Sequence, residues 1–293
     1  MKKLLLLLLP LLLLSSCTST GEYKKVTEGS NKDYSHTMVT DIVKKGKVSQ
    51  RFELRHGDCT GEDCHRDRQR NEYGTFIKYP TNEYWFSWSF YLNDNFMIEK
   101  AGTSLVQTKL VSNSSRGSVL WMLQSKEDSE WIDIKNETHY QTNACSILKV
   151  DDAIGKWTDI MIRADYSTSI DNASPITKAT GSYLDVYLNG TKTSCRYNYP
   201  MMKADELANH GMLDSTPHMA FKYGIYQGFI SRWLDENKTR EFKITADKKW
   251  AWSPDNTPFD EDWGIKTPTA IVYYDEIRHG LTRESVTIGD PVD

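Results

Sequence analysis

The sequence has little net charge, and it lacks any apolar run long enough to span a membrane. It contains 36 Lys and Arg against 40 Asp and Glu in 293 residues, a formal net charge of −4. Whole-chain electrostatics therefore give no reason to expect binding to nucleic acid. A composition of 39% hydrophobic and 12% aromatic residues excludes a disordered chain. Any polyanion that the protein binds must be held by a local basic site.

The N-terminal apolar run is too short for a transmembrane helix. It extends from Leu4 to Leu14 and is broken only by Pro10, whereas a membrane span needs roughly 20 residues. Lys2 and Lys3 precede this run, so the pattern predicts a signal peptide over residues 1–16.

The signal peptide ends in Leu14-Ser15-Ser16-Cys17, which resembles the lipobox of bacterial lipoproteins. We expect acylation of Cys17 and a flexible tether over residues 17–36. The expected location is the bacterial cell envelope, with the protein lipid-anchored in the outer membrane or periplasm or at the cell surface. Ordinary cleavage nearby, with an incidental Cys17, is the alternative.

Cysteine is also scarce, with 5 in the chain. The four cysteines after Cys17 form an even number, which in an exported protein suggests two disulfides with three possible pairings. We expect Cys59 to pair with Cys64, close enough to staple one loop, and Cys145 to pair with Cys195. A zinc site at residues 59–65 would need a second ligand pair that the sequence lacks.

Alternation of apolar and polar residues predicts an all-β protein. In Tyr84 to Leu92 the even positions are large and apolar, while Ser87 and Ser89 lie on the other face, as in a half-buried strand. Asn189-Gly190 predicts a hairpin leading into a strand that contains Cys195. Further strands are expected near residues 51–55, 104–111, 119–124, 131–135, 158–164, 183–188, 219–227 and 270–277. Without a composition break, residues 37–293 are expected to form one two-sheet domain.

Three segments each place polar residues on one face of a predicted strand. These residues are Arg68, Arg70 and Glu72 in the first segment, Gln107 and Lys109 in the second, and Lys222, Gly224 and Tyr226 in the third. Any one segment alone would be read as an exposed face with a surface ion pair. If all three line one concave sheet, they favour a site for an acidic sugar chain, with Gly224 leaving room for the ligand.

The same segments resemble motifs of the jelly-roll polysaccharide lyases. The segments Arg70-Asn71-Glu72, Gln107-Thr108-Lys109 and Phe221 to Gln227 are similar to an Arg-Ser-Glu-type strand, a Gln-x-His strand and a Lys-x-Gly-x-Tyr strand. Together with residues 51–59 and 273–280 they most resemble the group containing glucuronan lyase and heparin lyase I. The resemblance covers roughly residues 45–280 and implies a two-sheet β-jelly-roll sandwich of the concanavalin A type. Lys109 stands where many relatives have His.

The resemblance implies β-elimination on 4-linked uronic-acid polymers. Gln107, Arg70 and Lys109 would neutralise the sugar carboxylate, which makes the C5 proton acidic enough to remove. Tyr226 would take that proton and then protonate the leaving oxygen. Its pKa, about 10 in a free Tyr, would have to be lowered by cations, and Lys222 and Arg70 are available. The reaction itself requires no cofactor.

Further contacts to substrate are expected from Lys222, Arg68 and Glu72. Trp250 and Trp252, with Trp263 in the same polar loop, would stack on sugar rings or, alternatively, pin that loop to the core. The resemblance to some relatives also allows a structural calcium ion at Asp275 and Glu276, although no loop has a recognisable calcium spacing.

The expected partner is an acidic polysaccharide, with membrane contact through the lipid only and neither nucleic acid nor a protein partner. The alternative function is a non-catalytic, lectin-like glycan-binding lipoprotein. Tyr226 with Gln107 favours catalysis, whereas Lys109 in place of His favours binding alone. A hydrolase is disfavoured because the polar segments lack a carboxylate pair. A charged Lys109 suits carboxylate binding, so we expect glucuronan-like or mannuronate-rich substrates.

Overall fold

The computed structural model describes residues 29–80, 82–94, 96, 101–111, 119–126, 129–137, 142–167, 182–201, 218–240 and 257–289. Cys17, Trp250 and Trp252 lie outside the described residues, as does the expected signal peptide, so the predictions made for them stay predictions. Within the described ranges, no helix is long and apolar enough to cross a membrane.

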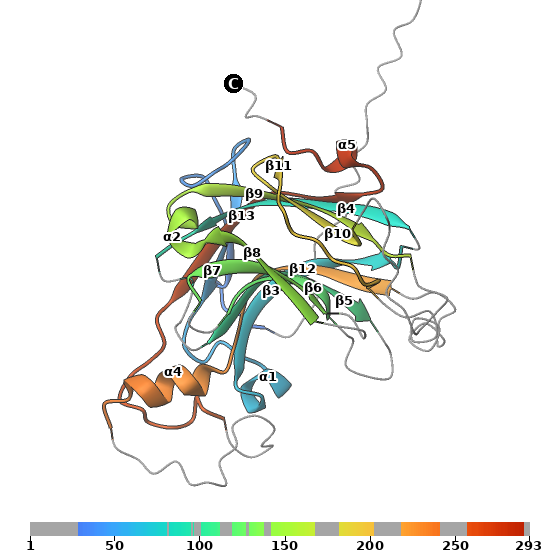
Figure 1. The fold of residues 1–293 in the computed structure, drawn as a ribbon. Coiled ribbons are helices and arrows are strands. Elements are labelled where there is room, and N and C mark those ends of the chain that lie inside the picture. Colours follow the sequence, from blue (N-terminus) through green and yellow to red (C-terminus); the bar gives the residue numbers. More distant parts are fainter. Residues whose placement is uncertain are drawn as a thin grey trace, which may run out of the picture.

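The described strands form two antiparallel sheets that lie face to face (Figure 1). In spatial order, the seven-stranded sheet contains β1 (His36–Val39), β2 (Ser49–Leu54), β13 (Ala270–Gly280), β4 (Glu83–Leu92), β9 (Trp157–Asp165), β10 (Leu184–Leu188) and β11 (Thr191–Lys192). The six-stranded sheet contains β3 (Arg68–Lys78), β12 (His218–Gly228), β5 (Gly102–Val111), β6 (Val119–Ser125), β7 (Trp131–Glu137) and β8 (Thr142–Lys149). The described helices are short: α1 (Glu62–His65), α2 (Val150–Ala153), α4 (Ile230–Asn237) and α5 (Arg283–Val286).

The core lies between the two sheets and is rich in aromatic rings. Phe86 of β4 packs its ring 5.2 Å from that of Trp121 and 4.9 Å from that of Phe221, measured between centroids. The alternation predicted for β4 is confirmed, since its even positions face this core. The strand is not half-buried as predicted, because its other face is covered as well: Ser87 and Ser89 are 0% exposed, and the Ser87 hydroxyl donates to the Val286 carbonyl of the C-terminal segment.

The other predicted strands are also present, with ends displaced by a few residues, and the structure adds β1 and β8. The Asn189-Gly190 hairpin between β10 and β11 is confirmed, and both turn residues have positive φ, 47° and 80°. The prediction that Cys195 lies in the following strand is wrong. That strand ends at Lys192, and Cys195 lies in the irregular segment beyond it.

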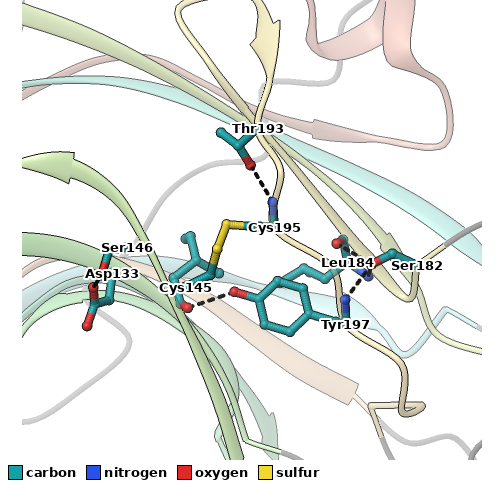
Figure 2. Close-up of a disulfide and its surroundings, with 9 residues drawn as sticks. Asp133, Cys145, Ser146, Ser182, Leu184, Thr193, Cys195 and Tyr197 are labelled. Atoms are coloured by element: carbon teal, nitrogen blue, oxygen red, sulfur yellow. Dashed lines mark hydrogen bonds between the residues drawn. A yellow bond between two sulfur atoms is a disulfide. The ribbon is translucent and has the colours of Figure 1, made fainter.

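Both predicted disulfides are confirmed. Cys145 lies on β8 at one edge of the six-stranded sheet, and Cys195 follows the edge strand β11 of the other sheet (Figure 2). The Tyr197 hydroxyl crosses the same gap and donates to the Ile134 carbonyl at 2.7 Å. A covalent bond and a buried hydrogen bond therefore fix the two sheets to each other at this edge.

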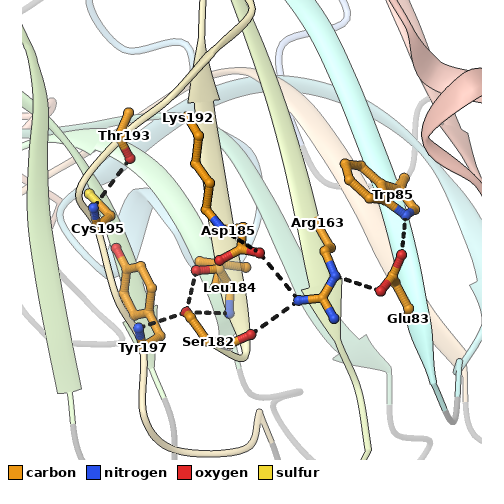
Figure 3. A network of polar contacts seen from close by, with 10 residues as sticks. All are labelled: Glu83, Trp85, Arg163, Ser182, Leu184, Asp185, Lys192, Thr193, Cys195 and Tyr197. Atoms are coloured by element: carbon orange, nitrogen blue, oxygen red, sulfur yellow. Dashed lines mark hydrogen bonds and ion pairs between the residues drawn. The ribbon is translucent and has the colours of Figure 1, made fainter. Parts of the chain in front are cut away.

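An ionic network covers part of the outer face of the seven-stranded sheet (Figure 3). Arg163 of β9 donates to Glu83 of β4 at 2.5 Å and to Asp185 of β10 at 3.4 Å. Lys192 also reaches Asp185, at 3.1 Å. Partly exposed pairs of this kind contribute roughly 0–1 kcal/mol each. Their main effect is that the charges on this face neutralise one another.

A β-bulge interrupts the pairing of β12 with β5 between Tyr223 and Tyr226. Gly224 lies in this bulge with φ 139°, and a Cβ there would collide with the backbone oxygen of Asn71 on β3. The Tyr274 hydroxyl, from the opposite sheet, lies 2.8 Å from both the Gly224 and the Leu105 carbonyl oxygens. Gly224 therefore leaves room for the neighbouring strand, and the prediction that it leaves room for a ligand is wrong.

Replacing Gly224 by Ala should destabilise the protein by about 3 kcal/mol or more, because both the backbone angle and the space exclude a side chain. Gly46→Ala is the matched control, since Gly46 also has positive φ but nothing within 4 Å of a Cβ. We expect that change to cost about 1 kcal/mol. Urea unfolding measures both, and an equal loss in the two variants would contradict this account of Gly224.

Candidate active site

The three polar segments lie on neighbouring strands, as predicted. β12 runs between β3 and β5 in the six-stranded sheet. Tyr226 pairs in register with Arg70, and Lys222 pairs with Gln107. Residues from three distant parts of the sequence thus share one face of the sheet.

A cavity of about 390 Å³ lies over this face. Of the predicted site residues, Arg68, Arg70, Gln107, Lys109 and Tyr226 line it. The remaining lining residues are Arg66, Gly102, Ser104, Val119, Met122, Gln124, Lys135, Glu137, Gly228 and Phe229. Across the whole lining, five side chains are cationic (Arg66, Arg68, Arg70, Lys109 and Lys135) and one, Glu137, is acidic. The cavity therefore has the local basic lining that binding of an acidic polymer would require.

The buried carboxylate of Glu72 lies at the centre of the site's hydrogen bonds. One of its oxygens accepts from the Gln107 amide at 2.5 Å. The other accepts from the Lys222 ammonium at 2.6 Å and from the Arg70 guanidinium at 3.2 Å. Glu72 therefore holds side chains from β3, β12 and β5 in fixed positions.

Glu72 and Lys222 were predicted to contact substrate, but the structure places them beneath the cavity. Their exposed fractions are 2% and 1%, and neither lines it. Burial opposes ionisation of Glu72, but Lys222 and Arg70 outweigh it and lower its pKa. Burial lowers the pKa of Lys222 to about 8 despite the attraction of Glu72. Both groups are thus charged at neutral pH and support the cavity floor.

Arg70 is held by a second carboxylate, which the sequence did not reveal. Its guanidinium donates to Asp63 at 2.5 Å, and Asp63 lies on α1, inside the loop closed by the Cys59–Cys64 disulfide. Burial favours the neutral form, but Glu72 and Asp63 together raise the pKa of Arg70. The disulfide loop therefore fixes the orientation of the arginine beside the cavity.

The Tyr226 ring lies over the Arg70 guanidinium, 4.4 Å from the ring centroid, with Arg68 at 5.8 Å. Of the two cations predicted beside Tyr226, Arg70 is there, whereas Lys222 is paired with Glu72 and Arg68 is the second cation at the ring. The prediction of a lowered pKa for Tyr226 is wrong, because the net shift is upward. Burial raises its pKa, and Arg68 and Arg70 offset this only in part.

Lys109 faces the cavity from β5, and among the described residues it has no acidic partner within ion-pair distance. Burial lowers its pKa, and the positive charge of Arg70 lowers it further, while Glu72 opposes the shift. Its pKa is therefore not the unperturbed value assumed from the sequence. A carboxylate entering the cavity would meet a Lys109 side chain that makes no ion pair with any described acidic residue.

The end of the cavity beyond Tyr226 is shaped by a strained connection between β12 and α4. Phe229 has φ 63° and ψ 38°, and Asp67 has φ 58°, a left-handed conformation that costs a side-chain-bearing residue roughly 1–2 kcal/mol. The buried Asp67 carboxylate accepts from the Ser231 amide at 2.7 Å and from its hydroxyl at 2.6 Å. Burial raises the pKa of Asp67 to about 6, although these hydrogen bonds oppose the shift.

The remaining predicted positions that the structure describes are not brought to the cavity. Trp263 is 1% exposed, packs with Ile230 and Leu234, and donates to the Pro258 carbonyl, so it pins its loop to α4. Asp275 accepts from the amides of Lys44 and Lys45 at 3.0 Å each, and Glu276 pairs with Arg278. N–H donors thus occupy both oxygens of Asp275 and one oxygen of Glu276, which does not fit the expected calcium ion. Within the described ranges, no cluster of acidic, His or Cys side chains could hold a metal.

Comparisons with known proteins agree with this architecture. A family model described as "Polysaccharide lyase" matches residues 18–278. A search of curated proteins found no match. An endo-β-1,4-glucuronan lyase from the fungus Trichoderma reesei is similar with a TM-score of 0.53 and 14% identity, covering 91% of this chain and 92% of that chain. An alginate lyase from Pseudomonas aeruginosa is similar with a TM-score of 0.46 and 12% identity, covering 86% of this chain and 87% of that chain. The predicted jelly-roll fold and family resemblance are confirmed.

The Glu72–Lys222 pair generates a stability prediction. Glu72→Gln should destabilise the protein by about 3 kcal/mol, because it leaves the buried Lys222 ammonium without its anion. Adding Lys222→Met should recover most of this loss, since the double variant buries no unpaired charge. Urea unfolding of the two single variants and the double variant measures the coupling. Strictly additive losses would show that the two groups do not depend on each other.

Proposed function

Because the chain belongs to the polysaccharide lyase family, we propose that it cleaves 4-linked uronic-acid polymers, glucuronan-like or mannuronate-rich, by β-elimination. The observation that carries the proposal is the position of Tyr226, stacked on Arg70 in a cavity lined by five cationic side chains. A polyuronate carries one carboxylate on each sugar, which matches this lining. A 4-linked glucuronate polymer is also the substrate named for the fungal structure of the same fold.

Charge neutralisation at the sugar carboxylate is the first requirement of the reaction. In our proposal the Lys109 ammonium pairs with that carboxylate, since the described residues give it no acidic partner. Gln107 adds an amide hydrogen bond, because its Nε2 donates one N–H to Glu72 and keeps the second for the substrate. Arg70, already paired with Asp63 and Glu72, adds positive potential beneath the sugar. These groups stabilise the enolate-like charge that develops on the carboxylate.

Proton transfer is assigned to Tyr226. In the proposed step the phenolate oxygen takes the C5 proton, the C4=C5 double bond forms, and the C4–O4 bond breaks. The phenol then returns the proton to the departing O4, so the enzyme is unchanged. Because burial raises the pKa of Tyr226, the phenolate depends on the charges of Arg68 and Arg70. Among the described residues no group hydrogen-bonds the hydroxyl, which leaves it available to substrate.

Tyr226→Phe should lower kcat by about 100-fold or more, while the protein folds and binds polymer nearly as before. Only the phenolic hydroxyl is lost, and the ring retains its stacking on Arg70. Cleavage is measured as the ultraviolet absorbance of the unsaturated product, and binding as retention of the variant by immobilised polyuronate.

The same two assays separate the lyase from a lectin-like protein. A wild-type protein that binds polyuronates and yields no unsaturated product from any of them would support the lectin-like function. Tyr226→Ala is the matched variant, since it also removes the ring; it should lose activity and bind more weakly. A Tyr226→Phe enzyme that retains most of its turnover would remove Tyr226 from the mechanism.

The role of Lys109 is tested by measuring cleavage of a set of uronic-acid polymers that differ in configuration at C5. In β-D-glucuronate and β-D-mannuronate the C5 proton and O4 leave from the same side, so Tyr226 alone can serve as base and acid. In guluronate and iduronate they leave from opposite sides, so a second proton-transfer residue is needed. We expect cleavage of glucuronan-like or mannuronate-rich chains and little action on polyguluronate or heparin, because Lys109 is assigned to the carboxylate.

Lys109→Arg is the control for this assignment. It keeps the positive charge but cannot act as a base, so it should retain a substantial part of the activity, whereas Lys109→Met should lose most of it. Burial and Arg70 shift the pKa of Lys109 toward the neutral form, which makes this comparison informative. Preferred cleavage of polyguluronate, lost in Lys109→Arg, would show instead that Lys109 is a base.

A further inference from the structure

Phe229 is an exposed aromatic residue on the wall of the cavity. The described residues leave six large hydrophobic side chains exposed: Met38, Val48, Phe76, Trp131, Phe229 and Leu281. Of these, Phe229 alone lines the cavity, with 43% of its surface exposed. It therefore adds an exposed aromatic ring to a lining whose other apolar side chains are Val119 and Met122, and whose other aromatic ring is that of Tyr226.

The backbone at Phe229 is held in a conformation that large side chains rarely adopt. Its left-handed φ and ψ of 63° and 38° would suit glycine. The Asp67 carbonyl accepts from the Phe229 amide at 2.9 Å and from the Ile230 amide at 3.5 Å, and the Asp67 carboxylate holds Ser231. A strained residue that its surroundings fix so completely, at the edge of a site, indicates a functional constraint on the side chain.

The ring also has a defined orientation. The Arg232 guanidinium lies 4.1 Å from its centroid, so one side of the ring is covered by a cation while the ring still lines the cavity. A pyranose ring presents apolar C–H groups on its faces and polar groups at its edge. An aromatic ring suits the sugar face, and the neighbouring arginines suit the carboxylate at its edge.

We infer that Phe229 is a sugar-stacking residue that binds a uronate ring in the subsite next to Tyr226. The inference rests on the proposed function and deepens it. The sugar bound at Phe229 is not the one that loses its proton, so the residue acts on substrate affinity and on the position of the chain, not on the chemistry.

Binding is measured by calorimetry with mannuronate and glucuronate oligomers, in a Tyr226→Phe background so that the ligand stays intact. Phe229→Gly should weaken binding about 3- to 10-fold without lowering the midpoint of thermal unfolding, because glycine suits the backbone angle. Phe229→Leu keeps apolar bulk without an aromatic face and should also bind weakly, whereas Phe229→Trp should bind like the parent protein. Tyr187→Ala is the matched control, since Tyr187 lies under Arg283 on the other sheet, and it should leave binding unchanged.

Kinetics with Tyr226 intact provide the second measurement. The Phe229→Gly and Phe229→Leu enzymes should show a raised KM in the same range with kcat nearly unchanged. Parent-like binding by Phe229→Gly or Phe229→Leu would overturn the inference while leaving the lyase proposal standing. A wild-type protein that neither binds nor cleaves any polyuronate would instead overturn the proposed function, and the stacking role with it.

Discussion

The carboxylate of Glu72 accepts hydrogen bonds from Gln107, Lys222 and Arg70, and the arrangement of the site depends on this interaction. Glu72 lies on β3, whereas Gln107 lies on β5, with β12 between them. The register partner of Glu72 on β12 is Gly224, which has no side chain, so the carboxylate can reach across that strand. A buried anion surrounded by two cations and an amide is stable only when all three partners are in place, which couples the positions of the three strands.

Two further groups, Tyr274 and Asp63, hold β3, β12 and β5 in place from outside the cavity. Tyr274 of the opposite sheet places its hydroxyl within 2.8 Å of the carbonyl oxygens of both Gly224 and Leu105, at the β-bulge. Asp63, fixed in the Cys59–Cys64 loop, holds the far side of the Arg70 guanidinium. The polar side chains that line the cavity are therefore positioned by groups that lie outside it.

A nearly neutral chain obtains a basic cavity because its charges are distributed unevenly between the two sheets. On the outer face of the seven-stranded sheet, Arg163 and Lys192 are neutralised by Glu83 and Asp185 (Figure 3). In the cavity the cationic side chains outnumber the one acidic side chain that lines it. The attraction for an acidic polymer is consequently local, and its range is limited by screening to about 10 Å at moderate salt.

The sequence by itself determined the strands and the faces of the polar segments. The alternation in Tyr84 to Leu92 and the shared face of Arg68, Arg70 and Glu72 depend only on the period of a strand, which is a local property. The Asn189-Gly190 hairpin and the Cys59–Cys64 loop could also be predicted, because a turn type and a short sequence separation are local properties too. The motif resemblance added the family, because the motifs occur in the same order along the chain.

Only the tertiary structure decided which polar groups line the cavity and which lie beneath it. Lys222 and Glu72 are 150 positions apart in the sequence, and their pairing removes both from the cavity. The direction of the Tyr226 pKa shift depends on burial in the fold, which outweighs the positive charges of Arg68 and Arg70. Phe229 gave no signal, because its exposure and its left-handed backbone depend on the folded chain, in which its amide donates to the carbonyl of Asp67 between α1 and β3. Periodicity fixes the face on which a side chain lies, whereas burial and ionisation depend on neighbours that the fold brings from elsewhere in the chain.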